Sequence, residues 1–195
     1  MGLAAAPGVW AQGTVAYSNI SPSGGASSGG LNNYYEQFTA GSAASLDEVD
    51  LQIFNFNGTS DSLSLSLFSD SSGAVGKPIA SLGTVSTAAA AAQEFTPTTL
   101  AFSFSPVALS SGTTYWLGTL GGANDNVEEY TSGSGSGLPG WSLGQEKAYI
   151  SGNYYSIGSD EMGLTLDVTP APEPATLALA GLGGLGMLWQ FRRRK

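Results

Sequence analysis

The chain has 195 residues, with 15 acidic and 6 basic side chains, no cysteine and no histidine. This length is typical of one domain with its own hydrophobic core. The missing cysteines exclude disulfides and thiol catalysis, and the missing histidines exclude a serine–histidine triad and the usual zinc ligand. Charged residues are only 11% and glycines number 28, a composition that favours a secreted β-rich protein without enzymatic activity over a cytosolic enzyme.

The N-terminal residues 1–11 are small and mostly apolar, and Val9-Trp10-Ala11 fits the small-x-small pattern before a signal-peptidase cut. A complete secretory signal also has a positively charged start and 7–15 apolar residues. Both features are only partly present. We interpret residues 1–11 as the remnant of a signal peptide and expect the mature body to begin near Gln12.

Residues 12–168 are predicted to form one extracellular domain built of strands. Apolar and polar residues alternate in 49–53, 63–67, 100–104 and 162–168, which is the period of a half-buried strand. Weaker strands are expected at 14–20, 34–39, 79–85, 114–120, 138–143 and 147–157, and the alanine run 88–92 allows at most one helical turn. Turn dipeptides separate these segments: Asn57-Gly58, Ser72-Gly73, Ser111-Gly112, Gly121-Gly122, Pro139-Gly140 and Ser151-Gly152. About ten short strands predict an all-β fold, an antiparallel β-sandwich of jelly-roll type, with a closed barrel as the alternative.

Two segments of the body resemble a known family. Residues 66–82, which read SLFSDSSGAVGKPIASL, and residues 109–117, which read LSSGTTYWL, are similar to the hallmark strands of choice-of-anchor domains of type R, and Gln37-Phe38-Thr39 fits as well. Lys77-Pro78 departs from that pattern in one loop. The resemblance implies an extracellular β-sandwich with no assigned biochemistry.

Aromatic pairs are the first candidates for ligand contact. An exposed ring can stack on the apolar face of a sugar. Trp141, Tyr154 and Tyr155 are the residues that we expect to contact carbohydrate, with packing at the rim of the core as the alternative. A carbohydrate-binding module would need these rings exposed.

Acidic residues are the second group of candidates. Glu48 and Asp50 lie on one face of a strand, about 7 Å apart by the strand repeat, where a solvated face is the ordinary interpretation and a polysaccharide-active carboxylate pair is a remote one. Asp125, Asn126 and Glu128 group oxygen donors that suit Ca²⁺, although their spacing does not match an EF-hand. Beyond this calcium option we expect no cofactor.

The C-terminal segment differs from the body. A proline-rich linker, residues 169–174, precedes the uncharged residues 175–191, which would span about 26 Å as a helix. Four glycines disfavour a soluble helix here but are tolerated in membranes. We therefore expect a single transmembrane helix at 175–191, followed by a basic cytoplasmic tail at 192–195 that stops transfer and sets topology: Arg192, Arg193, Arg194 and Lys195.

The order of these three parts resembles the PEP-CTERM sorting signal of Gram-negative bacteria. Pro172, Glu173 and Pro174 stand before the glycine-rich span and the terminal arginines, and the resemblance implies that they form the recognition motif of an exosortase. Such a protease removes the tail and passes the protein to the cell surface or the extracellular polymer. A plain membrane anchor without processing is the alternative.

The charge distribution agrees with export. Residues 1–171 hold 14 acidic residues and two lysines, a balance of 2 − 14 = −12, so a nucleic-acid partner is not expected. We predict a structural or adhesive protein of the cell surface or extracellular matrix and biofilm, held briefly in the inner membrane. Its expected partners are an exosortase and extracellular polysaccharide (exopolysaccharide).

Overall fold

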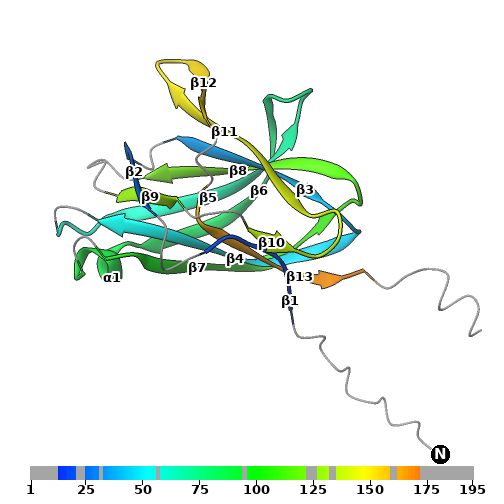
Figure 1. Cartoon of the computed structure of the whole chain (residues 1–195), viewed down its shortest axis with the longest axis horizontal. Coiled ribbons are helices and arrows are strands. Elements are labelled where there is room, and N and C mark those ends of the chain that lie inside the picture. The colour runs from blue at the N-terminus through cyan, green and yellow to red at the C-terminus, as the bar shows by residue number, and fades with distance from the viewer. Residues whose placement is uncertain are drawn as a thin grey trace, which may run out of the picture.

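Two antiparallel sheets form the body of the protein (Figure 1). The computed structural model describes residues 13–20, 25–30, 33–55, 58–93, 96–121, 127–131, 135–158 and 162–171. All strand pairs in this part of the chain are antiparallel. The prediction of an all-β sandwich is confirmed at this level, and the jelly-roll type stays a prediction.

The first sheet, sheet A, has seven strands in the order β10-β1-β13-β4-β9-β2, with β7 paired to β4. Its longest strands, β4 and β7, pair over most of their length, while β9 pairs with the last residues of β4. The bounds are β1 Thr14–Ser18, β2 Gly25–Gly30, β4 Ala44–Asn55, β7 Thr98–Leu109, β9 Val127–Thr131, β10 Ser136–Gly137 and β13 Leu164–Pro170.

The second sheet, sheet B, has six strands in the order β12-β11-β3-β8-β5-β6. One four-residue helix, α1 (Ala88–Ala91), connects β6 of this sheet to β7 of sheet A, which agrees with the single turn expected from the alanine run. The bounds are β3 Tyr34–Ala40, β5 Ser62–Asp70, β6 Val75–Ser86, β8 Thr113–Gly121, β11 Ser142–Ile150 and β12 Asn153–Gly158.

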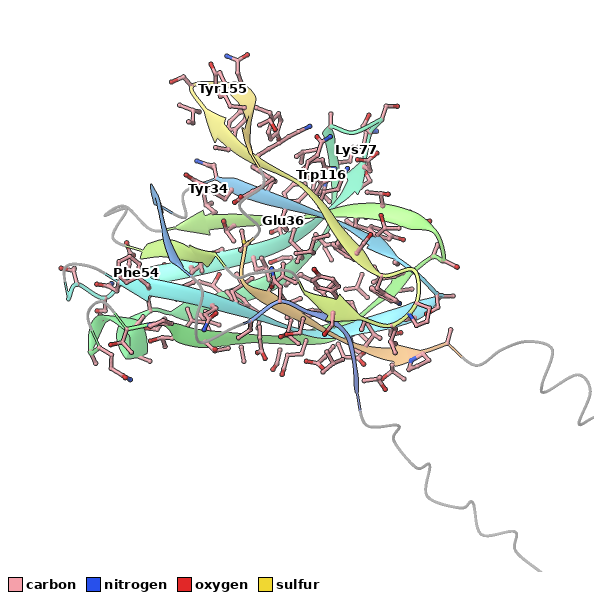
Figure 2. The ribbon with its side chains drawn as sticks, viewed as in Figure 1. Tyr34, Glu36, Phe54, Lys77, Trp116 and Tyr155 are labelled. Atoms are coloured by element: carbon pink, nitrogen blue, oxygen red, sulfur yellow. The ribbon has the colours of Figure 1, made fainter. Side chains whose placement is uncertain are left out.

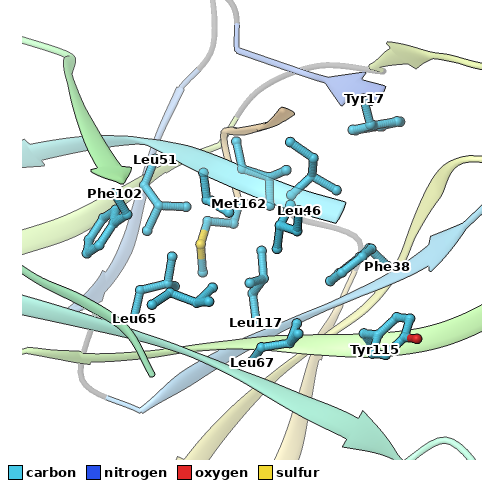
Figure 3. Close-up of a cluster of buried hydrophobic side chains, with 14 of the residues drawn as sticks. Tyr17, Phe38, Leu46, Leu51, Leu65, Leu67, Phe102, Tyr115, Leu117 and Met162 are labelled. Atoms are coloured by element: carbon cyan, nitrogen blue, oxygen red, sulfur yellow. The ribbon is translucent and has the colours of Figure 1, made fainter. Parts of the chain in front are cut away.

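The core lies between the sheets and is built from alternate residues of each strand (Figure 3). On β5 the three leucines of 63–67 are fully buried while the serines between them are less buried, as the alternation predicted. Phe38 of β3 stacks on Tyr115 of β8 with ring centroids 5.5 Å apart. Buried residues from both sheets fill the rest, including Leu46, Val49, Leu51, Ile53, Leu100, Phe102, Leu117, Met162, Leu164, Leu166 and Val168.

The turn dipeptides end strands where the sequence placed them. Ser151 and Gly152 have φ values of 51° and 87° and form a two-residue loop between β11 and β12. Two positive φ angles are the requirement of a type I′ hairpin turn, which glycine meets without steric cost. The single strand expected at 147–157 is therefore two strands joined by a tight turn.

Other strand boundaries differ from the sequence prediction. Residues 138–141 form a turn in which Trp141 N donates to Leu138 O at 3.1 Å, so the strand expected at 138–143 begins only at Ser142. Strands β2, β9 and β10 were not predicted. They are short, and β2 reads GASSGG, so neither apolar alternation nor β-branched residues announce it.

Several predicted segments lie outside the described residues. These are the signal remnant 1–11, the Pro-Glu-Pro motif, the expected transmembrane helix 175–191 and the basic tail 192–195. Within the described part of the chain, no helix has the length and apolar character needed to cross a membrane.

Candidate functional site

The junction between body and tail is the first site of interest. The last strand, β13, lies inside sheet A, where it pairs with β1 on one side and β4 on the other. Pro170 is paired with Ala44, and Ala171 N donates to Ala43 O at 3.1 Å. The chain is thus held to the sheet up to the residue before Pro172, and the motif follows directly. Pro172, Glu173 and Pro174 themselves lie outside the described residues.

A hydrogen-bond network lies on the outer face of sheet B. Asp70, the last residue of β5, accepts through Oδ1 from Trp116 Nε1 at 2.8 Å and from Gln37 Nε2 at 3.0 Å. Its Oδ2 accepts from Gly73 N at 3.0 Å. The Gly73 bond is the main reason why the pKa of Asp70 is lowered. Burial, the next-largest effect, raises the pKa, and the bonds from Trp116 and Gln37 and the charge of Lys147 each lower it by less. The converging donors hold this carboxylate in its charged form.

Lys147 closes the network from β11. Its Nζ lies 4.7 Å from the centroid of the Trp116 ring and donates to Gly73 O. A cation over an indole face is attracted by the ring quadrupole. Trp116 is fully buried although it points away from the main core, so Asp70, Lys147 and the β5–β6 turn bury it on the outer face (Figure 2). The two segments that resemble choice-of-anchor domains meet at the Asp70–Trp116 bond.

Aromatic rings continue across the same face. Phe68 of β5 and Tyr35 of β3 have centroids 5.5 Å apart, Tyr35 and Tyr154 5.2 Å, and Tyr154 and Tyr149 4.8 Å. Gly118 of β8 lies beneath Phe68 and Tyr35, since a Cβ there would be 2.7 Å from both rings. Burial raises the pKa of Tyr35 to about 12, with added contributions from the charge of Tyr154, a hydrogen bond with Tyr154 and the charge of Tyr149. This row is packed at its Phe68 end and open to solvent at its Tyr154 end.

The three residues expected to contact carbohydrate have different environments. Tyr154 and Tyr155 are 42% and 51% exposed on the projecting β11–β12 hairpin (Figure 2). Trp141 is only 6% exposed and belongs to the core. The expectation that Trp141 offers a stacking ring is wrong, because the 138–141 turn folds its indole inward against Gly41. Trp141 instead packs in the hydrophobic core, as the alternative interpretation of the sequence had it.

The acidic residues of β4 form part of a larger cluster on sheet A. Glu48, Asp50 and Asp167 of β13 place carboxylate oxygens within 4.8 Å of one another, and each is half-buried. Burial raises the pKa of Asp50 and of Asp167, and the charge of Glu48 raises both further. Asp167 also raises the pKa of Asp50, and Asp47 that of Asp167. Ser103 Oγ of β7 donates to Glu48 Oε2 at 2.6 Å.

Among the described residues, the carboxylates of Glu48, Asp50 and Asp167 are the group that could hold a hard cation such as Ca²⁺. Ca²⁺ takes six to eight oxygen ligands, and exposed acidic groups are common without an ion. The sequence analysis named only Glu48 and Asp50. In the structure Asp167 of the neighbouring strand β13 lies beside them, so the group has three carboxylates. Of the calcium candidates, Asp125 and Asn126 lie outside the described residues, and of Glu128 only the backbone, in β9, is described.

A pair of buried glutamates was missed at the sequence level. Glu36 of β3 and Glu146 of β11 lie opposite each other in the strand register and are 0% and 1% exposed. Glu36 Oε2 accepts from Met162 N at 3.4 Å. The signal was present, because Glu36 stands at an inward position between Tyr34 and Phe38, where alternation predicts an apolar residue.

Comparison with known proteins identifies the segment that follows β13. Residues 170–194 match the model of the PEP-CTERM protein-sorting motif. The chain carries a PEP-CTERM sorting motif. No curated protein matches the chain at a significant level. The PEP-CTERM match starts at Pro170, the last residue of β13.

The PEP-CTERM motif marks a protein that is exported and sorted to the cell surface, and it implies processing by an exosortase. The prediction of this motif from Pro172, Glu173, Pro174 and the basic terminus is confirmed. The choice-of-anchor resemblance of the body stays a prediction. Because β13 ends where the PEP-CTERM segment begins, cleavage within that segment would remove no described strand of sheet A.

Proposed function

We propose that this protein is a non-catalytic structural or adhesive component of the bacterial cell surface and extracellular matrix. In this proposal a Gram-negative cell exports the sandwich, holds it transiently in the inner membrane through residues 175–191, and releases it by exosortase cleavage near Pro174. The PEP-CTERM match directly after β13 is the observation that carries the proposal.

The body has properties that support this role. It is acidic, it lacks the histidine and cysteine on which most nucleophilic and metal hydrolases depend, and its two sheets enclose a continuous apolar core. The sorting segment joins an interior strand of sheet A. A load on the tail or on a surface attachment there is therefore carried by the hydrogen bonds of β13 to both neighbours.

The experiment follows the tail during export. Cells make the wild-type protein or a variant with Pro172→Ala, Glu173→Ala and Pro174→Ala, and the cell-surface, matrix and inner-membrane fractions are analysed by mass spectrometry. We expect wild-type protein in the surface and matrix fractions without the residues beyond about Pro174, and the variant in the membrane with Arg192–Lys195 intact. Exported wild-type protein that keeps Arg192–Lys195 would contradict processing.

The matrix role needs its own measurement. A deletion strain complemented with the wild-type gene or with the triple variant is compared for adhesion and for the mass of matrix that resists washing. We expect the variant to match the deletion strain. A complete match of all three strains would overturn the structural role while leaving the sorting step intact.

A second candidate function is binding of exopolysaccharide, and the exposure of Tyr154 and Tyr155 favours it. The ring of Tyr154 is held by Tyr35 and Tyr149, and the more exposed ring of Tyr155 beside it in sequence offers a second flat apolar surface for sugars. Affinity electrophoresis of the exported protein through gels that contain the host polysaccharide measures this binding. We expect Tyr155→Ala to reduce the retardation and Val15→Ala, at a comparably exposed position on β1 of sheet A (48%), to leave it unchanged. Equal retardation of wild type and Tyr155→Ala would exclude Tyr155 as a polysaccharide contact.

A further inference from the structure

The two edges of sheet B differ in how open they are to another chain. An exposed edge strand offers unpaired N–H and C=O groups, and natural proteins protect such edges with lysine, proline and bulges. Strand β6 has these features, since Lys77 and Pro78 lie within it, Gly83 has a φ of 110°, and its pairing with β5 shifts register three times. It also runs beside β7 of the other sheet.

Strand β12, at the opposite edge, lacks this protection. Among the described strands only β11 pairs with it. Residues 148–158, which read AYISGNYYSIG, contain no charged residue and no proline. The hairpin projects beyond the body of the sandwich (Figure 1), so a second chain can approach it without contact with the rest of sheet B.

The backbone pattern shows which groups face outward. In a two-residue hairpin the residues that flank the turn exchange both backbone hydrogen bonds, and the pattern alternates along the strands. Ile150 and Asn153 flank the turn, and Ala148 is paired with Tyr155 two residues on. The N–H and C=O groups of Tyr154 and Ser156 therefore point away from β11.

Exposed, mostly apolar side chains lie beside these groups on both faces of the hairpin, with Tyr149 and Tyr154 on one face and Ile150 and Tyr155 on the other. Tyr149, Ile150, Tyr154 and Tyr155 are 37%, 56%, 42% and 51% exposed. Tyr154 is held by its contacts with Tyr35 and Tyr149, so less side-chain entropy is lost when a partner covers it. Exposed, pre-ordered aromatic residues are typical anchors of protein interfaces.

The charge distribution limits how a second copy of the chain can approach the molecule. Residues 1–171 carry a formal balance of −12, so two copies repel each other over most orientations. Pairing through the uncharged hairpin brings no carboxylate of either hairpin to the contact. An antiparallel strand pair around a two-fold axis is also self-complementary, because each donor of one copy meets an acceptor of the other.

We propose that two copies associate through β12, in antiparallel register centred on Tyr155, so that the two B sheets become one continuous sheet. Tyr154 of each copy then exchanges backbone hydrogen bonds with Ser156 of the other, and the two Tyr155 residues form the non-hydrogen-bonded pair on the axis. This deepens and rests on the proposed matrix role, since it names the protein itself as a partner.

The interface is small. If each of the four half-exposed side chains buries on the order of 100 Å², the pair of copies buries about 800 Å² of side-chain surface, below the about 1,200 Å² of stable complexes. We therefore expect a weak pair in dilute solution that becomes populated where copies are concentrated at a surface. Trapping by a disulfide is the suitable measurement for such a pair.

The test uses the exported protein recovered from the cell surface, which has no native cysteine to interfere. Directly opposite residues of a non-hydrogen-bonded pair have Cα atoms about 4.5 Å apart, within disulfide range. Under mild oxidation we expect Tyr155→Cys to form covalent dimer at least several-fold faster than Ile79→Cys, a matched control that is 47% exposed on the β6 edge. Equal rates for the two variants would overturn the proposal, because random collision would then explain both.

A second pair of variants, compared with Tyr155→Cys itself, tests the backbone contact without a further change to the aromatic residues. Proline at position 156 removes an N–H that points away from β11, so the hairpin keeps its own bonds. In the Tyr155→Cys background we expect Ser156→Pro to reduce the dimer rate to that of Ile79→Cys, and Ser156→Ala to leave it unchanged. An unchanged rate with Ser156→Pro would contradict edge pairing.

The outcomes separate this inference from the proposed function. Slow cross-linking of Tyr155→Cys together with normal surface sorting and adhesion overturns the β12 pairing alone. Equal adhesion of the deletion, wild-type and triple-variant strains in the earlier experiment overturns the matrix role, whatever the dimer rate. Cross-linking that is fast only after addition of host polysaccharide would contradict direct pairing and favour the polysaccharide as the occupant of the hairpin.

Discussion

The outer faces of the two sheets use the same residue type with opposite consequences. On sheet B, N–H groups from Trp116, Gln37 and Gly73 converge on Asp70 and lower its pKa. On sheet A, Asp50 and Asp167 face Glu48, and burial together with like charge raises both pKa values. The comparison teaches that an aspartate on a strand stabilises the fold where donors converge and destabilises it where carboxylates converge.

The largest effect is expected for Asp70→Asn. An amide keeps one acceptor oxygen where three N–H groups now meet a carboxylate, and its own NH₂ group faces donors. Hydrogen bonds to charged groups contribute about 1.5–3 kcal/mol each, so we expect a loss of about 2 kcal/mol in the free energy of unfolding. Urea unfolding followed by Trp fluorescence measures this loss. An unchanged midpoint would mean that the network has no net effect on stability.

Gly118→Ala tests the packed part of the sheet B face. A Cβ at position 118 would lie 2.7 Å from ring atoms of both Phe68 and Tyr35, so the rings must shift, and overpacking of this kind costs about 1–3 kcal/mol. The control is Gly13→Ala, directly before β1 of sheet A, where the added Cβ meets only Asp167 Cβ at 3.9 Å. We expect no loss there. Thermal unfolding of both variants checks the difference, and equal losses would contradict it.

The same shift has a spectroscopic consequence. The pKa of Tyr35, about 12, depends first on its burial. Displacement of the ring toward solvent in Gly118→Ala should move this pKa toward the ordinary value of about 10. Absorbance at the tyrosinate band during an alkaline titration follows the change. Because the raised pKa binds a proton that the unfolded chain releases earlier, wild-type stability should also fall between about pH 10 and 12.

Asp50→Asn is expected to act in the opposite direction from Asp70→Asn. The substitution removes one of three crowded charges and keeps the side-chain shape, so the free energy of unfolding should rise. Since Asp50 is partly exposed, solvent screening limits the gain to about 0.5 kcal/mol. A loss of stability comparable to that of Asp70→Asn would show that the sheet A cluster is stabilised by something other than the described residues, such as a bound cation.

The dependence on pH sharpens the two results. Asp70 has a lowered pKa in the folded state, so its carboxylate stabilises the fold at neutral pH and this stabilisation is lost as the pH falls through that pKa. Asp50 has a raised pKa in the folded state, so its charge destabilises the fold at neutral pH and protonation relieves this as the pH falls. Both variants should therefore differ most from wild type at neutral pH and approach it in acid, but from opposite sides. As the pH is lowered, the difference between Asp50→Asn and wild type should disappear before the difference between Asp70→Asn and wild type, because Asp50 has the higher pKa. Urea midpoints between pH 3 and 7 test this order.

Sequence reasoning found the parts of the fold that follow from local chemistry. Alternation located the strands around Leu63–Leu67 and Leu100–Phe104, and the Ser151-Gly152 dipeptide located the β11–β12 turn. Alternation could not predict that Glu36 is buried, because the pattern expects an apolar residue at an inward position. Its neighbour Glu146 is known only from the strand register. Registers between distant strands depend on pairing across the whole sheet, which no local window contains.

The sites show the same division. The tail motif was readable because its three parts are contiguous in sequence, whereas the Asp70 network joins residues from β3, β5, β8 and β11 and has no linear signature. Trp141 illustrates the opposite failure. Its ring was expected to be exposed for contact with carbohydrate, but the direction of the side chain depends on how the 138–141 turn packs against Gly41. Exposure of an aromatic residue is a tertiary property that composition does not determine.

The smallest expected effect belongs to Ser103→Ala on sheet A. Ser103 Oγ donates to Glu48 Oε2 at 2.6 Å, the one side-chain donor to the Glu48–Asp50–Asp167 cluster that the described residues show. The bond is exposed, so its removal should cost only about 0.5 kcal/mol. Ser105→Ala, the same substitution at an exposed position of β7, is the matched control and should be neutral.

If the Ser103 hydroxyl offsets part of the repulsion among the carboxylates, the cost of Ser103→Ala should shrink when Asp50→Asn is also present, because the remaining carboxylates then repel each other less. A double-mutant cycle from chemical unfolding measures this coupling. Strictly additive effects would show that Ser103 acts on β4–β7 pairing alone and that the sheet A carboxylates are independent of it.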